Sequence, residues 1–241
     1  GRLLLGPLPD VWPQQLYLLP TGPLLTVPFD ALRLNGRYLA QHADVANLAS
    51  LESLQRRRPE VPGDFRERVF VAGNPQSQRD PFRFELSSTP EIDAVTQRFV
   101  GPGLHVIQGV ALGRDEFADP RFAAAALLHL AIPGVLDLAR PDRSRLLLSA
   151  GADSPAAGAD TRLTPADVRT FRLEAALAAL TATAAANAAD LAHTGRVPLV
   201  SDFLDAGAGA VLYSLWPVGE AEAAAFANAF YERLDRDPNI G

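Results

Sequence analysis

Four histidines are the side chains of this chain best suited to moving a proton near neutral pH. His42 and His193 lie in polar segments, and His105 stands near the start of an apolar run. His129 lies inside an apolar run, where a histidine is more often a core residue than a catalytic one. No Gly-x-Ser-x-Gly turn, His-Glu-x-x-His pair or paired metal-ligand spacing accompanies them. The residues alone therefore present no complete catalytic set, and we expect neither a metal nor a cofactor.

Cysteine is absent from the chain. Without it there can be no disulfide framework, Cys-ligated zinc site, iron–sulfur cluster or thiol nucleophile. Any nucleophile in this protein would have to be an oxygen or nitrogen group.

The charge balance argues against two classes of partner. The 28 acidic residues outnumber the 22 basic ones, which gives a net charge of −6. Binders of nucleic acid or anionic membranes are normally basic, and the run Arg56-Arg57-Arg58 beside Pro59 is typical of a solvated loop. No segment approaches the roughly 18 apolar residues of a membrane span. We therefore expect a cytoplasmic protein that binds neither nucleic acid nor membrane.

The glycines of Gly207-Ala208-Gly209-Ala210 stand between an expected helix and an expected strand. A phosphate loop needs the opposite order, strand then helix, and the end of a helix disfavours anions. These glycines are better explained as a helix stop with close packing. A nucleotide-binding α/β protein is disfavoured, because no phosphate loop follows any expected strand.

Short apolar runs alternate with helical patterns, an order typical of a mostly parallel α/β sheet. Several runs are apolar almost throughout, as expected of strands covered on both faces. The seven expected strands are Gln15–Leu19, Arg68–Ala72, Leu104–Gln108, Leu127–Ile132, Leu146–Ser149, Ala176–Thr181 and Ala210–Leu215.

Helix signals fill several of the intervals. Thr89-Pro90-Glu91 supplies a capping hydroxyl, an early Pro and an early acid, and it predicts a helix whose buried face carries Ile92, Val95 and Phe99. The other helix signals are a capping box from Thr164 to Asp167, the segment Leu199–Ala206, and the segment Glu220–Leu234 with Phe226, Phe230 and Leu234 on one stripe.

Three polar stretches interrupt the pattern: Gln55–Asp64, Asn74–Phe84 and Ala150–Thr161. The last has small, unpatterned residues and is expected to be a mobile surface loop. None of the three divides the apolar residues into two cores, so we expect residues 1–241 to form one domain. Because the chain lacks Met, we expect it to be a piece of a longer protein, cut at both ends.

Several segments, taken in order, resemble the motifs of CHAT domains, caspase-like domains often joined to tetratricopeptide repeats. The opening segment Leu18–Leu32 is similar to the family's P-D-G-x-L-x-x-L-P-F-E-A-L. Two later segments are similar to short family motifs: Val71–Pro75 to G-N-P and Glu91-Ile92 to E-I. Two longer ones are Leu128–Gly134, which is similar to L-H-L-A-T-H-G, and Ala179–Ala184, which is similar to V-L-S-A-C-E. The family's closing helix and strand are matched by Phe203–Ala208 and Val211–Val218. The resemblance runs from about Leu16 to Tyr231.

This resemblance implies a caspase-like three-layer sandwich, with a mostly parallel central sheet and helices on both faces. In active members a His and a Cys at the carboxyl ends of neighbouring strands form a peptidase dyad, and the Cys attacks as thiolate. Carried over to this sequence, the His position falls on Pro133 and the Cys position on Thr183. A slip of the second position to Ala182 or Ala184 changes nothing, because the chain has no Cys.

The carboxyl ends of Leu127–Ile132 and Ala176–Thr181 are expected to lie side by side, and Pro133 and Thr183 to meet at one surface cleft. By the resemblance, Gly134 retains the backbone turn of the family motif, whereas His129 holds a structural position. The residues expected around this cleft are His129, Gly134, Thr181, Asp202, Asp205 and Glu220. Three of them, Asp202, Asp205 and Glu220, are acidic. They are candidates for contacting a basic side chain of a ligand, and the alternative is that they are ordinary charges on helix surfaces.

These expectations favour a degenerate caspase-like domain that binds a protein or peptide partner, or acts as a scaffold in a longer chain where tetratricopeptide repeats guide the partner. The alternative is a hydrolase with a replacement nucleophile, Thr183 or Ser214, and a histidine such as His193 brought in by the fold. Labelling with a fluorophosphonate separates the two.

Overall fold

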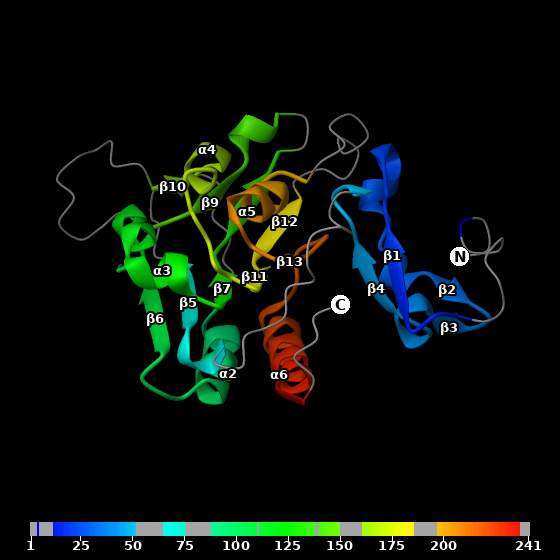
Figure 1. Cartoon of the computed structure of the whole chain (residues 1–241), viewed down its shortest axis with the longest axis horizontal. Helices are drawn as coiled ribbons and strands as arrows, with labels where there is room; N and C mark the ends of the chain where they lie inside the picture. Colours follow the sequence, from blue (N-terminus) through cyan, green and yellow to red (C-terminus); the bar gives the residue numbers. More distant parts are fainter. Residues whose placement is uncertain are drawn as a thin grey trace.

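The computed structural model describes residue 4 and residues 12–51, 65–75, 88–109, 111–137, 140–149, 161–185 and 197–236. At the centre of these residues lies a five-stranded parallel sheet with the strand order β13-β11-β7-β5-β6 (Figure 1). Its strands are β5 (Val69–Pro75), β6 (Leu104–Gly109), β7 (Leu127–Ala131), β11 (Leu177–Leu180) and β13 (Ala210–Tyr213). Each was expected from an apolar run, within a few residues at its ends.

Helices cover both faces of this sheet. Successive side chains of a strand point to opposite faces, so one strand contributes to a core on each face. In β5, Phe70 and Ala72 join one hydrophobic core, whereas Val69 and Val71 join the other. The first core includes side chains of α3 (Pro120–Ala124), α4 (Pro165–Val168) and α5 (Val200–Ala206), and the second those of α2 (Thr89–Arg98) and α6 (Glu220–Arg236). The mixed α/β fold with a mostly parallel central sheet is therefore confirmed, and it is consistent with a caspase-like sandwich.

A second, four-stranded sheet continues from the carboxyl ends of the first. It has the order β10-β9-β8-β12 and comprises β8 (Gly134–Leu136), β9 (Arg145–Leu147), β10 (Arg162–Leu163) and β12 (Thr183–Ala185). The strand expected at Leu146–Ser149 is β9, which runs antiparallel to β8 outside the parallel central sheet. An apolar run predicts burial but not which strand becomes its neighbour, so the sequence did not distinguish the two sheets.

The N-terminal segment, residues 12–51, has a hydrophobic cluster of its own, centred on Phe29 and Leu39. It contains a parallel pair of β1 (Gln15–Leu18) and β4 (Asp44–Asn47), and a hairpin of β2 (Arg33–Leu34) and β3 (Arg37–Tyr38). The expected strand Gln15–Leu19 therefore exists as β1, but it pairs with β4 rather than with the central sheet. In Figure 1 this segment, coloured blue, lies on the β13 side of the sheet.

Several helix boundaries test the expected signals. The Thr164–Asp167 capping box starts α4, and Gly207 ends α5 with a φ of 122°, as expected of a helix stop. Helix α2 differs, because it begins at Thr89 itself and its N-cap Ser88 makes no side-chain capping bond. The expected stripe on α6 is partly wrong: Phe226 is 48% exposed, and the buried residues are Ala227, Tyr231 and Leu234.

Short 3-10 helices connect these elements: η1 (Gly22–Thr26), η2 (Phe29–Ala31), η3 (Leu39–Gln41), η5 (Phe65–Glu67), η6 (Arg114–Ala118) and η7 (Pro141–Arg143). The loop expected to be mobile, Ala150–Thr161, lies outside the described residues except for its last position. Over the described ranges, no helix is long and apolar enough to cross a membrane.

Candidate functional site

The candidate site is built where β7 and β11 end. These strands are direct parallel neighbours, with Leu177 opposite Leu127 and Ala179 opposite His129. Each then continues into the second sheet, where β8 and β12 also run parallel and Thr183 lies opposite Gly134. The prediction that the two strand ends lie side by side is therefore confirmed. Parallel strands end at the same edge of a sheet, which is the usual place for a ligand crevice.

The backbone around Pro133 is firmly held. Pro133 and Gly134 are both buried, and the Pro133 carbonyl oxygen accepts a hydrogen bond of 2.7 Å from the Leu147 amide in β9. Pro133 thus joins the central sheet to the second sheet, and its ring offers no group that exchanges a proton. Whether a cleft opens over this position stays a prediction.

His129 lies two positions before the end of β7, and its ring is completely buried on the side of α2 and α6. Its Nδ1 lies 2.8 Å from the Tyr231 hydroxyl, and its Nε2 lies 3.4 Å from the Glu91 Oε1. Burial, and then the nearby Glu91 carboxylate, raise the pKa of Tyr231, so the hydroxyl stays protonated. His129 is accordingly a buried core histidine, as its apolar run indicates. Its Nδ1 is bonded to Tyr231, whereas its Nε2 has no hydrogen-bond partner among the residues that the structure describes.

The neighbouring strand β5 ends in a turn that only certain residues can make. A Cβ on Gly73 would lie 2.6 Å from the Ala131 carbonyl oxygen and 2.7 Å from the Ile92 Cδ1, so strand and helix can approach only at glycine. Asn74 follows with a φ of 50°, a left-handed conformation that Asn tolerates better than most residues. Its amide donates to the Ser88 Oγ, and its Nδ2 donates to the Thr89 Oγ1. The Thr89 hydroxyl therefore binds Asn74, which the sequence signal for a helix cap did not predict.

Two hydroxyl groups lie at the ends of β11 and β13. The Ser214 Oγ donates a hydrogen bond of 2.6 Å to the Thr181 carbonyl oxygen, which ties the two strand ends together. The Thr181 Oγ1 is shielded from solvent and has no hydrogen-bond partner among residues that the structure describes. Thr183 is the first residue of β12, and His193 lies outside the described residues.

Asp202 is not an ordinary helix-surface charge, because it is only 6% exposed. Its Oδ2 accepts from the Leu199 amide at 3.0 Å, and its Oδ1 accepts from the Arg169 Nη1 at 2.8 Å. The carboxylate thus fixes the start of α5 and is paired with a guanidinium. The other two acids stand elsewhere: Asp205 is exposed on α5, and Glu220 is the first residue of α6.

The N-terminal segment reaches the same end of the sheet. Leu25 of η1 packs against the core shared with β13, and Tyr213 has its pKa raised by burial and by the charge of Asp30 in η2. Although Asp30 as a whole is exposed, partial burial of its carboxylate raises its pKa as well. Asp30 belongs to the opening motif, yet nothing in the sequence indicated that its charge would act on Tyr213, the last residue of β13.

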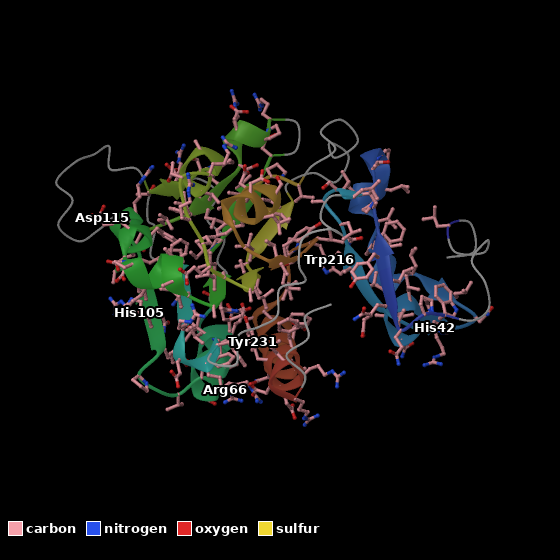
Figure 2. The ribbon with its side chains drawn as sticks, viewed as in Figure 1. His42, Arg66, His105, Asp115, Trp216 and Tyr231 are labelled. Carbon is pink, nitrogen blue, oxygen red and sulfur yellow. The ribbon has the colours of Figure 1, made fainter. Side chains whose placement is uncertain are left out.

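Trp216 is the most exposed aromatic residue near these strand ends, at 53%. Figure 2 shows it between the central sheet and the N-terminal segment in this view. A half-exposed indole three residues after β13 is a surface on which a partner could pack. In the sequence, Trp216 is one residue of the family-like segment Val211–Val218, and no local pattern indicates a role for it.

No group of three or more His, Asp or Glu side chains that could hold a metal ion occurs in the part of the chain that the structure describes.

Comparison with known proteins identifies the family. A family model described as CHAT domain matches residues 2–240, nearly the whole chain. No curated protein matches.

Proposed function

Because the chain belongs to the CHAT domain family, we propose that it is a catalytically degenerate, caspase-like member that binds a protein or peptide without cleaving it. One observation carries this proposal. The two positions to which the family's dyad is carried over by resemblance come together where Thr183 lies opposite Gly134, and they hold Pro and Thr.

The chemistry of these residues supports the loss of peptidase activity. A Pro ring cannot accept a proton, and a Thr hydroxyl needs an adjacent base before it can attack a carbonyl. His129 is the described histidine nearest in sequence to Pro133, and it is buried against Tyr231 and Glu91. Nucleophile and base act as a unit, and loss of either typically costs about 10⁴–10⁶ in rate.

Binding does not depend on the dyad, because a pocket or edge holds a ligand by shape and polarity. The exposed Trp216 and the paired ends of β8 and β12 are the features that would contact a partner. In a longer protein, neighbouring tetratricopeptide repeats would deliver that partner, as the family resemblance implies.

The replacement-nucleophile alternative makes a different prediction for one reagent. Fluorophosphonates label a serine or threonine only when a base activates its hydroxyl. We expect no specific labelling of the purified chain. Labelling that is lost in Ser214→Ala or Thr183→Ala, but kept in the control Ser50→Ala, would establish a hydrolase instead.

A further inference from the structure

The outer edge of β6 is an open strand edge. β6 is the last strand of the central sheet, and β5 is its only strand partner among the described residues (Figure 1). Its register with β5 is regular over Leu104–Gln108 and then shifts at Gly109. The opposite edge strand, β13, differs because the N-terminal segment lies on its side of the sheet (Figure 1), and Leu25 packs against the same core as Val211 and Tyr213.

Strand parity identifies the free backbone groups of this edge. The Val69 amide donates to the Gly103 carbonyl oxygen, so alternate residues Gly103, His105 and Ile107 direct their backbone groups toward β5. Leu104, Val106 and Gln108 therefore direct theirs outward. The Leu104 amide is already bonded to the Gly101 carbonyl oxygen at 3.2 Å. Among the residues that the structure describes, the Val106 and Gln108 amides therefore remain as the donors without a backbone partner.

The edge also lacks the features with which proteins protect an open strand. Leu104–Gln108 contains no Pro, Lys, Arg, Asp or Glu. His105 is its only titratable residue, and burial together with Arg121 lowers its pKa, so the strand is uncharged at neutral pH. Val100, in the turn before β6, is 83% exposed and adds apolar surface at the same end.

We propose that β6 pairs with β6 of a second copy of this chain, antiparallel and about a two-fold axis at Val106, so that one sheet runs through both copies. In this register each Val106 exchanges both its hydrogen bonds with its counterpart, and each Gln108 amide donates to the Leu104 carbonyl oxygen across the axis. All four free donors then have acceptors, although neither Leu104 amide is available.

The charges near β6 favour this orientation over the parallel one. Figure 2 shows Asp115 and Arg66 toward opposite ends of β6. Asp115 and Glu116 belong to η6, which follows the carboxyl end of the strand. The same helix contains Arg114, but its guanidinium is paired with Asp167. Antiparallel pairing keeps the two acidic ends apart, whereas parallel pairing would bring them together. A two-fold contact also closes on itself and does not propagate into a filament.

The absence of cysteine allows a direct test of the register. Opposed residues that exchange both hydrogen bonds have Cα atoms about 5.5 Å apart, within the range that a disulfide spans. Val106→Cys should therefore give a disulfide-linked dimer under mild oxidation. The matched control Gln108→Cys lies on the same side of the strand, but its two copies would be about 13 Å apart. It should stay unlinked alone and link when mixed with Leu104→Cys.

A second test examines the unmodified chain by light scattering after size-exclusion chromatography. We expect a concentration-dependent dimer that Val106→Pro converts to monomer, because this Pro removes only an outward donor. Val211→Pro in β13 is the control, and it should remain a dimer. The Ala210 amide bonds to the Ala176 carbonyl oxygen, so the Val211 amide points away from β11, at the opposite edge of the sheet. A monomer at hundreds of micromolar would overturn the proposal, as would equal linking of Val106→Cys and Gln108→Cys. If Val106→Pro does not fold by circular dichroism, the cysteine pair decides.

Discussion

At the scale of single residues, Pro133 and Thr183 carry the functional argument, and their proximity can be tested by thiol chemistry. Thr183→Cys gives the chain its only thiol. We expect its alkylation by iodoacetamide at neutral pH to become faster when Pro133→His is added, because a neighbouring imidazole stabilises the thiolate.

Leu51→Cys is the control for this measurement, since Leu51 is 64% exposed and lies in the N-terminal segment. Its alkylation should not respond to Pro133→His. Equal rates for Thr183→Cys with and without Pro133→His would show that the two positions do not meet as the resemblance implies.

The contact between His129 and Tyr231 joins β7 to α6 inside the core. Tyr231→Phe would leave the His129 Nδ1 buried without a partner, and a lost buried partner typically costs about 1–3 kcal/mol. We expect a drop of this size in the free energy of unfolding, measured by urea denaturation. Tyr38→Phe, at a residue 46% exposed, should change it little. Equal effects of the two variants would argue against a structural role of the buried contact.

Gly73 tests how tightly β5 packs against α2. In Gly73→Ala the added methyl would collide with the Ala131 carbonyl oxygen, and such overpacking typically costs about 1–3 kcal/mol. We expect a lower midpoint of thermal unfolding than in Gly113→Ala, whose added methyl meets nothing within 4 Å. A Gly73→Ala protein as stable as the Gly113→Ala protein would contradict the close approach.

At the scale of elements, we expect the stability of the N-terminal segment to depend on pH through Asp30 of η2. The raised pKa of Asp30 means that its contribution to stability is present below the ordinary aspartate pKa of 3.8 and is lost as the pH rises through the higher folded value. Asp30→Asn should therefore raise the unfolding temperature at neutral pH, with the gain shrinking as the pH approaches about 4. The control Asp142→Asn, an exposed aspartate in η7, should show no such pattern. A gain independent of pH would contradict the account.

The sequence predicted elements better than it predicted their neighbours. The apolar runs at β5, β7 and β11 indicated buried parallel strands, because strands covered on both faces have apolar side chains in both directions. The same criterion could not tell that β9 belongs to a second sheet. Nor did it reveal β8 and β12, which are only three residues each and lie outside the expected strands.

The candidate site divides in the same way. The side-by-side ends of β7 and β11 followed from the rule that parallel strands end together. That Pro133 and Thr183 share one surface cleft stays a prediction. The pairing of Asp202 with Arg169 and the effect of the Asp30 charge on Tyr213 both involve residues far apart in sequence. Only the tertiary fold brings such residues together, so no local sequence pattern predicts these interactions.

At the scale of the whole molecule, the fold offers two separate surfaces. The carboxyl ends of β7, β11 and β13 form the candidate partner site, whereas the open edge of β6 lies at the far side of the sheet. A partner bound at the strand ends would leave the β6 edge accessible. We therefore expect Val106→Pro to leave peptide binding at the strand ends unchanged, which separates the two proposals.

The most direct test of the central claim is incubation of the pure protein with a diverse peptide library, read by mass spectrometry for cleavage. Peptide binding is followed in parallel by the fluorescence of Trp216 in a Trp12→Phe variant, since the chain has only 2 Trp. A degenerate caspase-like domain predicts saturable binding of some peptides and no sequence-selective cleavage, including after Arg or Lys. Sequence-selective cleavage that disappears in Thr183→Ala would contradict it.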